Sequence, residues 1–389
     1  MSVSHEYVQY DKVDKEQLQS DIDAVKESIG APTWDDFQHL LKLERWGRVL
    51  SFCGYLMIAL LSYLESSTEI LSPLLFWVIA FFAAFALGVG NLSRWANVAH
   101  PILHGAYDKV PNIPYRYTKA GFARGVRRYI DWLDWIKPEA WAYEHNIMHH
   151  YHLGEKDDPD NIEHNLRAIE KFPRWLKYLF VYLLAATWKL SYYAPNTLRI
   201  LSNKENRKQN LQESYKLEYS PFKRNGFELW KNYVLPYALV RFVLIPCLFL
   251  PLGSEGVLNA LLITVMAELI ANLHSFLVIV PNHSAGDIYR FDEPHKSQGE
   301  FYLRQIMGSV NYNTGSDLID FSHGWLNYQI EHHLFPNLPL SQYQKMQPIV
   351  KAICEKYDLE YRQESVFKRL KMSIDLMVGK THLLKVEGV

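Results

Sequence analysis

Apolar residues along the chain gather in long runs that are separated by strongly charged stretches. Four of these runs approach the roughly 20 predominantly apolar residues that a helix needs to cross a bilayer. They lie at 47–65, 69–92, 230–252 and 255–281. A very short turn joins the first two runs, and the turn PLGSEG joins the last two. The pattern therefore predicts an all-α membrane protein with four transmembrane helices in two hairpins.

Positive charge is distributed unevenly around these runs. Neither turn contains Lys or Arg, whereas Lys42, Arg45, Arg48, Arg94 and the whole of 109–228 are rich in basic residues. Because basic loops favour the cytoplasmic side, both termini and the middle segment are expected in the cytoplasm, at the inner membrane if the protein is bacterial. The first apolar run begins only at residue 47, which is too late for a cleaved secretory signal.

The remaining segments complete the predicted organisation. Residues 1–44 form a cytoplasmic N-terminal segment, 45–360 a membrane domain with a cytoplasmic helical cap, and 361–389 a cytoplasmic tail. The stretch 174–194 carries two lysines and many aromatic residues, which favours a helix lying in the membrane interface. A fifth span is the alternative, and it would invert the second pair of spans.

Single residues near the runs carry two further expectations. Arg241 lies inside the third run and should snorkel or face the helix bundle. Five tryptophans near the spans are expected to anchor the protein at the interface, although one or two of them could line a substrate slot instead. They are Trp132, Trp135, Trp141, Trp175 and Trp188.

Composition narrows the function classes. A net charge of −1 argues against a nucleic-acid binder, which needs a basic surplus to neutralise phosphates. The cysteines Cys53, Cys247 and Cys354 lie far apart, so neither a disulfide framework nor a cysteine metal site is expected. Histidine is the abundant metal-capable residue, with 16 copies.

Eight histidines follow the predicted spans at their cytoplasmic ends. The segments that hold them are HPILH, EHNIMHHYH, PNH and IEHH. On a helix, the first segment places its two imidazoles on one face, and the second places two ligands one turn apart with a third rotated to the side. The histidines are His100, His104, His145, His149, His150, His283, His332 and His333.

This number of imidazoles indicates two metal ions, because one zinc ion is satisfied by about four ligands. Imidazole suits several metals, and iron is expected because a pair of irons can activate dioxygen whereas zinc has no redox chemistry. Redox chemistry is what an unactivated methylene of a lipid chain requires, since it has no acidic proton and no leaving group. A membrane metal-binding or transport protein is a distant alternative, but its histidines would lie within the spans.

The three motifs H-x-x-x-H, H-x-x-x-H-H and Q-x-x-H-H resemble, in this order, those of the integral-membrane fatty acid desaturases. The resemblance covers about residues 45–360. Gln329 replaces the first histidine of the third motif, and LNYQIEHHLFPNLP is similar to the front-end (delta-5/delta-6-like) desaturases. These enzymes insert a double bond between an existing one and the carboxyl end. The H-P-G-G haem motif of a fused cytochrome b5 does not occur in the sequence.

The resemblance implies an O2-dependent desaturase that introduces a cis double bond into an acyl-lipid or acyl-CoA substrate. A di-iron hydroxylase or ketolase, or a sphingolipid desaturase, is the alternative on the same scaffold. The eight histidines would bind two irons, with Gln329 and Asn282 as weak or indirect contacts. Asp157, Asp158 and Asp160 could accept hydrogen bonds from the ring N–H groups of these histidines. His274 competes with His283 for its role but is expected to be structural.

The chain also needs a source of electrons, and an external ferredoxin or cytochrome b5 is expected as the donor. A basic run with Arg124, Arg127 and Arg128 precedes the second histidine motif and is a candidate docking surface for that carrier. Contact with anionic lipid head groups is an equally good interpretation of this run.

Overall fold

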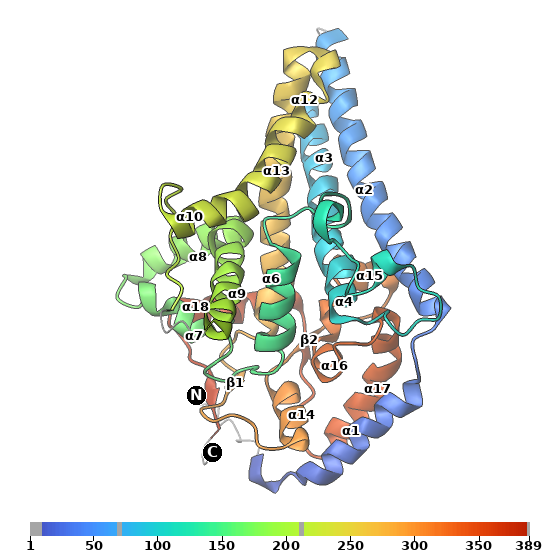
Figure 1. Ribbon diagram of the computed structural model, residues 1–389, viewed down its shortest axis with the longest axis vertical. Helices are drawn as coiled ribbons and strands as arrows, with labels where there is room; N and C mark the ends of the chain where they lie inside the picture. Colours follow the sequence, from blue (N-terminus) through green and yellow to red (C-terminus); the bar gives the residue numbers. More distant parts are fainter. Residues whose placement is uncertain (1–9, 68–71, 210–213, 387–389) are drawn as a thin grey trace.

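The computed structural model describes residues 10–67, 72–209 and 214–386. Figure 1 shows a cone whose narrow end consists of long helices and whose broad base consists of shorter ones. The long helices are α2 (Trp34–Ser67), α3 (Pro73–Ser93) and α13 (Gly253–Ile279). Each packs against the other two.

Within the described residues, three helical stretches are long and apolar enough to cross a membrane: Trp34–Ser67, Pro73–His104 and Leu250–Asn282. They contain the predicted runs 47–65, 69–92 and 255–281, except that 69–71 lie outside the described residues. The second stretch passes from α3 through a π-helical turn, Arg94–Ala99, into α4 (His100–His104). The helix that crosses the membrane therefore continues into the first histidine motif.

The remaining predicted run, 230–252, which is the third in chain order, is helical but broken into pieces. These are α10 (Arg224–Leu229), α11 (Leu235–Leu239) and α12 (Ile245–Cys247), joined by π-helical turns at Trp230–Val234 and Val240–Leu244. Pro236 and Pro246 stand at the second position of α11 and α12. Because proline lacks a backbone N–H and clashes with the preceding turn, the α-helical ladder widens just before each proline.

Arg241 joins this broken helix to the bundle. Its guanidinium donates a hydrogen bond of 2.7 Å to Tyr55 Oη of α2 and another to Asn91 Oδ1 of α3. Arg241 therefore faces the helix bundle, which is the second of the two positions that the sequence allowed. Small residues allow close packing elsewhere, because a Cβ added at Gly88 of α3 would lie 2.8 Å from Ile270 of α13.

The expected interfacial segment forms α8 (Arg174–Trp188), which a π-helical turn connects to α9 (Ala194–Lys208). One face of α8 buries Val181, Ala185 and Trp188. The opposite face exposes large apolar side chains, namely Trp175, Leu179, Tyr182 and Leu183. Such a two-faced helix of 15 residues fits a position in the interface rather than a crossing.

The base of the cone is an assembly of short helices around the histidines. They are α1 (Lys15–Ile29), α5 (Arg128–Asp131), α6 (Pro138–Tyr143), α7 (Ile162–Asn165), α14 (Gln298–Met307), α15 (Asp317–Ser322), α16 (Gln329–Leu334), α17 (Leu340–Lys356) and α18 (Val366–Met377). Two parallel strand pairs join them, β1 (Tyr289–Arg290) with β4 (Leu384–Lys385) and β2 (Asn311–Tyr312) with β3 (Gln363–Glu364). The predicted tail beyond residue 360 thus packs onto the membrane domain.

The interface expectation is wrong for four of the five tryptophans. Trp132, Trp135, Trp141 and Trp188 belong to a large apolar core, and none is more than 5% exposed. Only Trp175, at 69% exposure, has the surface position expected of an anchor. Indole rings fill large volumes, and this base uses them to build its interior.

Candidate metal centre

Four chain segments deliver the eight histidines. His100 and His104 lie at either end of α4, one turn apart, and their ring centroids are 5.0 Å apart. The helix ends directly after them at Gly105, whose φ of 81° is in the left-handed region that glycine tolerates. His283 follows α13, while His332 and His333 lie in α16.

The second motif has a local geometry that differs from the expected one. Glu144–His149 is a π-helical turn, in which the His150 amide donates to the His145 carbonyl at 3.1 Å. Residues five apart then share a face, so His145 pairs with His150 and not with His149. A regular α-helix would have paired His145 with His149, as the spacing predicted. The wider turn therefore decides which of the two groups of rings each histidine of this motif joins.

The eight rings form two groups. Within each group, the nitrogens that could bind a metal all lie within 4.8 Å of one another. His332 and His333, although adjacent in sequence, serve different groups because consecutive helical residues point in different directions. One group contains His100, His104, His145, His150 and His332, and the other contains His149, His283 and His333.

The arrangement of nitrogen atoms fits metal ions. His100 Nε2 lies 3.1 Å from both His145 Nε2 and His332 Nε2, and His145 Nε2 lies 3.3 Å from His150 Nε2. His104 Nε2 and His333 Nε2 are buried without a hydrogen-bond partner. Burial of an unpaired polar atom costs free energy, and a metal ion at the centre of each group would satisfy these nitrogens.

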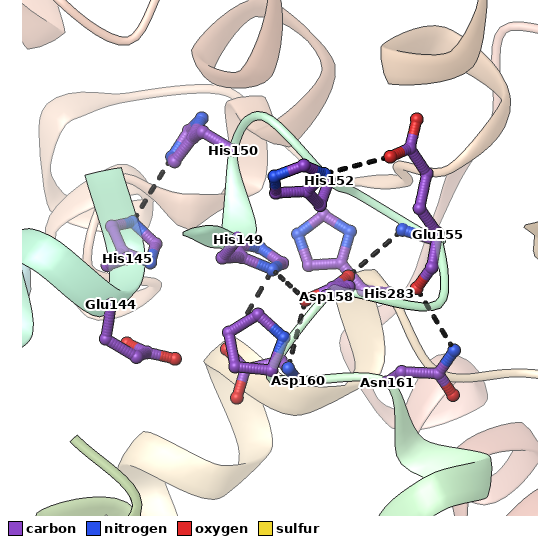
Figure 2. A network of polar contacts seen from close by, with 12 residues as sticks. Glu144, His145, His149, His150, His152, Glu155, Asp158, Asp160, Asn161 and His283 are labelled. Carbon is purple, nitrogen blue, oxygen red and sulfur yellow. Dashed lines mark hydrogen bonds and ion pairs between the residues drawn. The ribbon is translucent and has the colours of Figure 1, made fainter. Parts of the chain in front are cut away.

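The opposite ring nitrogens are held by hydrogen bonds that set the tautomer. His149 Nδ1 lies 3.0 Å from Asp158 Oδ1, as Figure 2 shows. His333 Nδ1 lies 2.9 Å from Gln305 Oε1, and His332 Nδ1 lies 3.2 Å from Tyr343 Oη. An acceptor at Nδ1 keeps the proton there and leaves Nε2 free as a ligand.

The amides near the second group form a chain of contacts. His283 donates from Nδ1 to the Gly308 carbonyl at 2.9 Å, and Gln329 Nε2 lies 2.8 Å from His283 Nε2. Asn282 donates to Gln329 Oε1 at 3.1 Å. Gln329 thus contacts His283 directly, and Asn282 contacts Gln329.

The structure separates the remaining candidate residues, and two residues were missed. Of the three candidate aspartates, Asp157 is exposed, whereas Asp158 lies against His149. His274 lies outside both groups and bonds through Nε2 to the Ser322 carbonyl at 2.7 Å, which agrees with a structural role. Gln305 and Tyr343 had no signal in the sequence, because neither stands at a fixed spacing from a histidine motif.

Several of the eight histidines lie outside the helices that are long enough to cross the membrane, and burial determines whether their imidazole rings are charged. It lowers the pKa of His145, His150, His332 and His333 well below the ordinary value, and the pKa of His283 to about 3. These imidazoles are therefore neutral at pH 7, as metal binding requires. Burial also opposes protonation of His149, but the Asp158 carboxylate outweighs it and raises the pKa of that ring.

A cavity of about 220 Å³ leads to the two groups. His100, His145, His149 and His283 form its polar end. The other walls are mainly apolar and include Trp95, Trp141, Leu184, Trp188, Phe276, Ile279 and Leu326. Trp141 stacks on His145 with ring centroids 4.5 Å apart. A narrow apolar cavity that ends at ligands of this kind fits a hydrocarbon chain.

Comparison with known proteins agrees with this geometry. A sequence model of the fatty acid desaturase family matches residues 75–365, which is most of the chain. The chain belongs to the fatty acid desaturase family. The desaturase is 25% identical over 362 residues to the NADPH-dependent stearoyl-CoA 9-desaturase of Mycobacterium tuberculosis (strain CDC 1551 / Oshkosh), covering 90% of this chain and 75% of that one.

Two further relatives differ in name and in coverage. The Delta(5) fatty acid desaturase A of Dictyostelium discoideum is 24% identical over 306 residues, which cover 75% of the desaturase and 61% of the relative. The sn-1 linoleoyl-lipid 6-desaturase of Synechocystis sp. is 22% identical over 286 residues, covering 70% and 72% of the two chains. The family and these relatives identify the chain as an oxidoreductase that desaturates fatty acyl chains.

The candidate docking arginines of the desaturase are bound to its own chain. Arg127 forms hydrogen bonds of 2.8 and 2.6 Å to the Asp131 carboxylate. Arg128 donates to the Asn232 carbonyl at 2.8 Å, and Arg124 lies 3.1 Å from Glu139 Oε1. All three side chains are half-buried. These contacts fix the position of the segment that leads into the second histidine motif.

Proposed function

We propose that the desaturase is of the front-end type and inserts a cis double bond into a lipid-linked or CoA-linked acyl chain. One observation carries the proposal. Two groups of imidazoles, all of them buried or partly buried, converge beside an apolar cavity. The similarity of the third motif to front-end enzymes and the Delta(5) relative support the narrower assignment.

The proposal assigns the eight histidines to two iron ions, one for each group. Bound iron supplies the one-electron chemistry that reduces O2 and removes hydrogen from unactivated carbon. The residues of the chain supply the rest. Asp158, Gln305 and Tyr343 orient three of the ligands, and Trp141 and Trp188 line a cavity that keeps the alkyl chain dry and extended.

In the membrane, we assign four spans, with the broken helix Arg224–Cys247 as the third. Its contacts from Arg241 to α2 and α3 support a position within the bundle. The basic middle segment then lies in the cytoplasm with both termini and the metal centre. Helix α8 would rest in the cytoplasmic interface.

Electrons would come from an external ferredoxin or cytochrome b5. Arg124 is the best docking candidate of the three arginines, because its partner Glu139 is itself half-exposed and the pair is open to solvent. Arg124→Glu should lower carrier-driven turnover and its salt dependence, with an unchanged rate when a small chemical reductant replaces the carrier. Equal loss of both rates would refute docking at Arg124.

Expression in a host of known fatty acid composition tests the function. Mass spectrometry should find new double bonds on the carboxyl side of an existing one, and none with His145→Ala. New double bonds only on the methyl side would refute the front-end assignment. Hydroxylated products without new double bonds would instead identify a hydroxylase. Metal analysis of active protein should give two irons per chain, and one zinc without iron would refute the di-iron assignment.

A further inference from the structure

A second cavity, of about 430 Å³, lies beside the one that leads to the histidines. Leu166 and Met377 line both cavities, so these two side chains form a shared wall. Met377 is buried, and its unbranched thioether can change rotamer at little cost. An amphiphilic molecule could therefore place its apolar part in the first cavity and its polar part in the second.

The side chains that line the second cavity carry more positive than negative charges. It contains Arg167, Lys177, Arg290 and Lys385 against two carboxylates, those of Glu163 and Glu170. Arg290 is paired with Glu163. In the described part of the chain, Arg167, Lys177 and Lys385 have no carboxylate within 4.0 Å. Among the described residues, these three cations line a concave surface with no carboxylate within ion-pair distance.

The fold brings these charges together from separate parts of the sequence. The parallel pair of β1 and β4 sets Arg290 directly beside Lys385. Arg290 already has Glu163 as its counter-ion, so Lys385 is the cation of this strand pair that has no carboxylate within 4.0 Å among the described residues. Lys177 comes from α8, the same helix whose Phe180 and Leu184 line the apolar cavity. One helix thus contributes to both the apolar and the basic site.

We propose that the second cavity binds the phosphate-bearing head group of the acyl carrier, while the acyl chain passes Leu166 and Met377 toward the histidines. The inference rests on the proposed function, since it concerns the substrate of the same site. A coenzyme A thioester and a phospholipid both offer this chemistry. A neutral glycolipid or a cationic sphingoid base does not, because neither would compensate the three free cations.

Matched ligands isolate the phosphate. Calorimetric titration of the solubilised full chain should compare linoleoyl-CoA with linoleoyl-pantetheine, which keeps the thioester but has neither the phosphates nor the nucleoside. Phosphatidic acid and diacylglycerol form the corresponding lipid pair. The phosphate-bearing member of one pair should bind roughly tenfold more tightly, with a preference that falls as salt is raised. The pair that shows the preference identifies the carrier.

Substitutions then locate the effect. Arg167→Gln, Lys177→Gln and Lys385→Gln together should remove the preference. The matched control replaces three exposed lysines of α1 and α17 with glutamine. These lysines do not line the cavity, so the control removes the same amount of charge elsewhere. These are Lys26, Lys345 and Lys351.

The shared wall needs its own test. Met377→Trp should weaken binding of the acylated ligand at least tenfold while the affinity for coenzyme A alone is unchanged, and Met377→Leu should bind both as the parent does. Equal affinities within both ligand pairs, or an equal loss of preference in the control triple variant, would overturn the proposal. Failure to desaturate any linoleoyl ligand, which carries the existing double bond that a front-end enzyme requires, would refute the proposed function separately, because the binding measurements need no turnover.

Discussion

Gln305 provides the sharpest test of how the metal centre is held. Its Oε1 accepts from His333 Nδ1 at 2.9 Å, and its Nε2 donates to the His150 carbonyl at 3.3 Å. His333 is 0% exposed, so no water can replace the lost acceptor. In Gln305→Ala the proton is free to move to Nε2, where it would block the nitrogen that faces the second group.

The expected loss of iron affinity in Gln305→Ala follows from the role of Gln305 in orienting His333. Removing a residue that orients a metal ligand typically lowers metal affinity by about 10- to 100-fold, equivalent to about 1.4–2.7 kcal/mol. The measurement is a competition between the purified, iron-loaded protein and a chelator, followed by metal analysis. Gln305→Glu keeps an acceptor at Oε1 and should retain most of the affinity.

A second control separates this effect from general damage to the fold. Gln342 is also a buried glutamine, but its side chain donates to Asp36 at 3.1 Å, away from the histidines. Gln342→Ala should destabilise the protein without changing iron affinity. Unchanged iron affinity in Gln305→Ala, or an equal loss in Gln342→Ala, would refute the reasoning.

Three further predictions follow from the structure. His149→Ala and His333→Ala should each abolish desaturation while the membrane-bound fraction of the protein is unchanged, because both lie outside the helices that can cross the membrane. Lys189→Met should lower the free energy of unfolding by about 3–5 kcal/mol, measured by denaturation in detergent, because Asp134 loses its buried counter-ion. Gly88→Leu should lower the melting temperature, at a cost of about 1–3 kcal/mol, because any side chain there meets Ile270.

Each of these has its own control. His152→Ala should retain activity, since His152 lies outside both histidine groups, and loss of activity there would weaken the ligand assignment. Adding Asp134→Leu to Lys189→Met should restore part of the stability, and no recovery would argue against an unpaired charge. Gly88→Ala should be milder than Gly88→Leu, and an identical melting temperature in all three proteins would contradict close packing.

The sequence alone determined which side chains carry the chemistry. Apolar runs of spanning length predicted three helical stretches that the structure contains, because the bilayer sets a length that composition reveals directly. The histidine motifs predicted the eight rings that converge, because their spacing is local and survives in any helical turn. Local patterns of this kind need no knowledge of the tertiary fold.

Only the tertiary structure decided how these parts are arranged. The π-helical turn at Glu144–His149 assigns His145 and His149 to different groups, although the spacing placed them one helical turn apart. Gln305 reaches His333 across 28 residues, and Arg290 meets Lys385 across a strand pair. Contacts of this kind depend on the packing of distant segments and on backbone geometry that single-residue patterns do not encode. The histidines that converge could therefore be predicted, but their grouping, their hydrogen-bond partners and the basic second cavity required the fold.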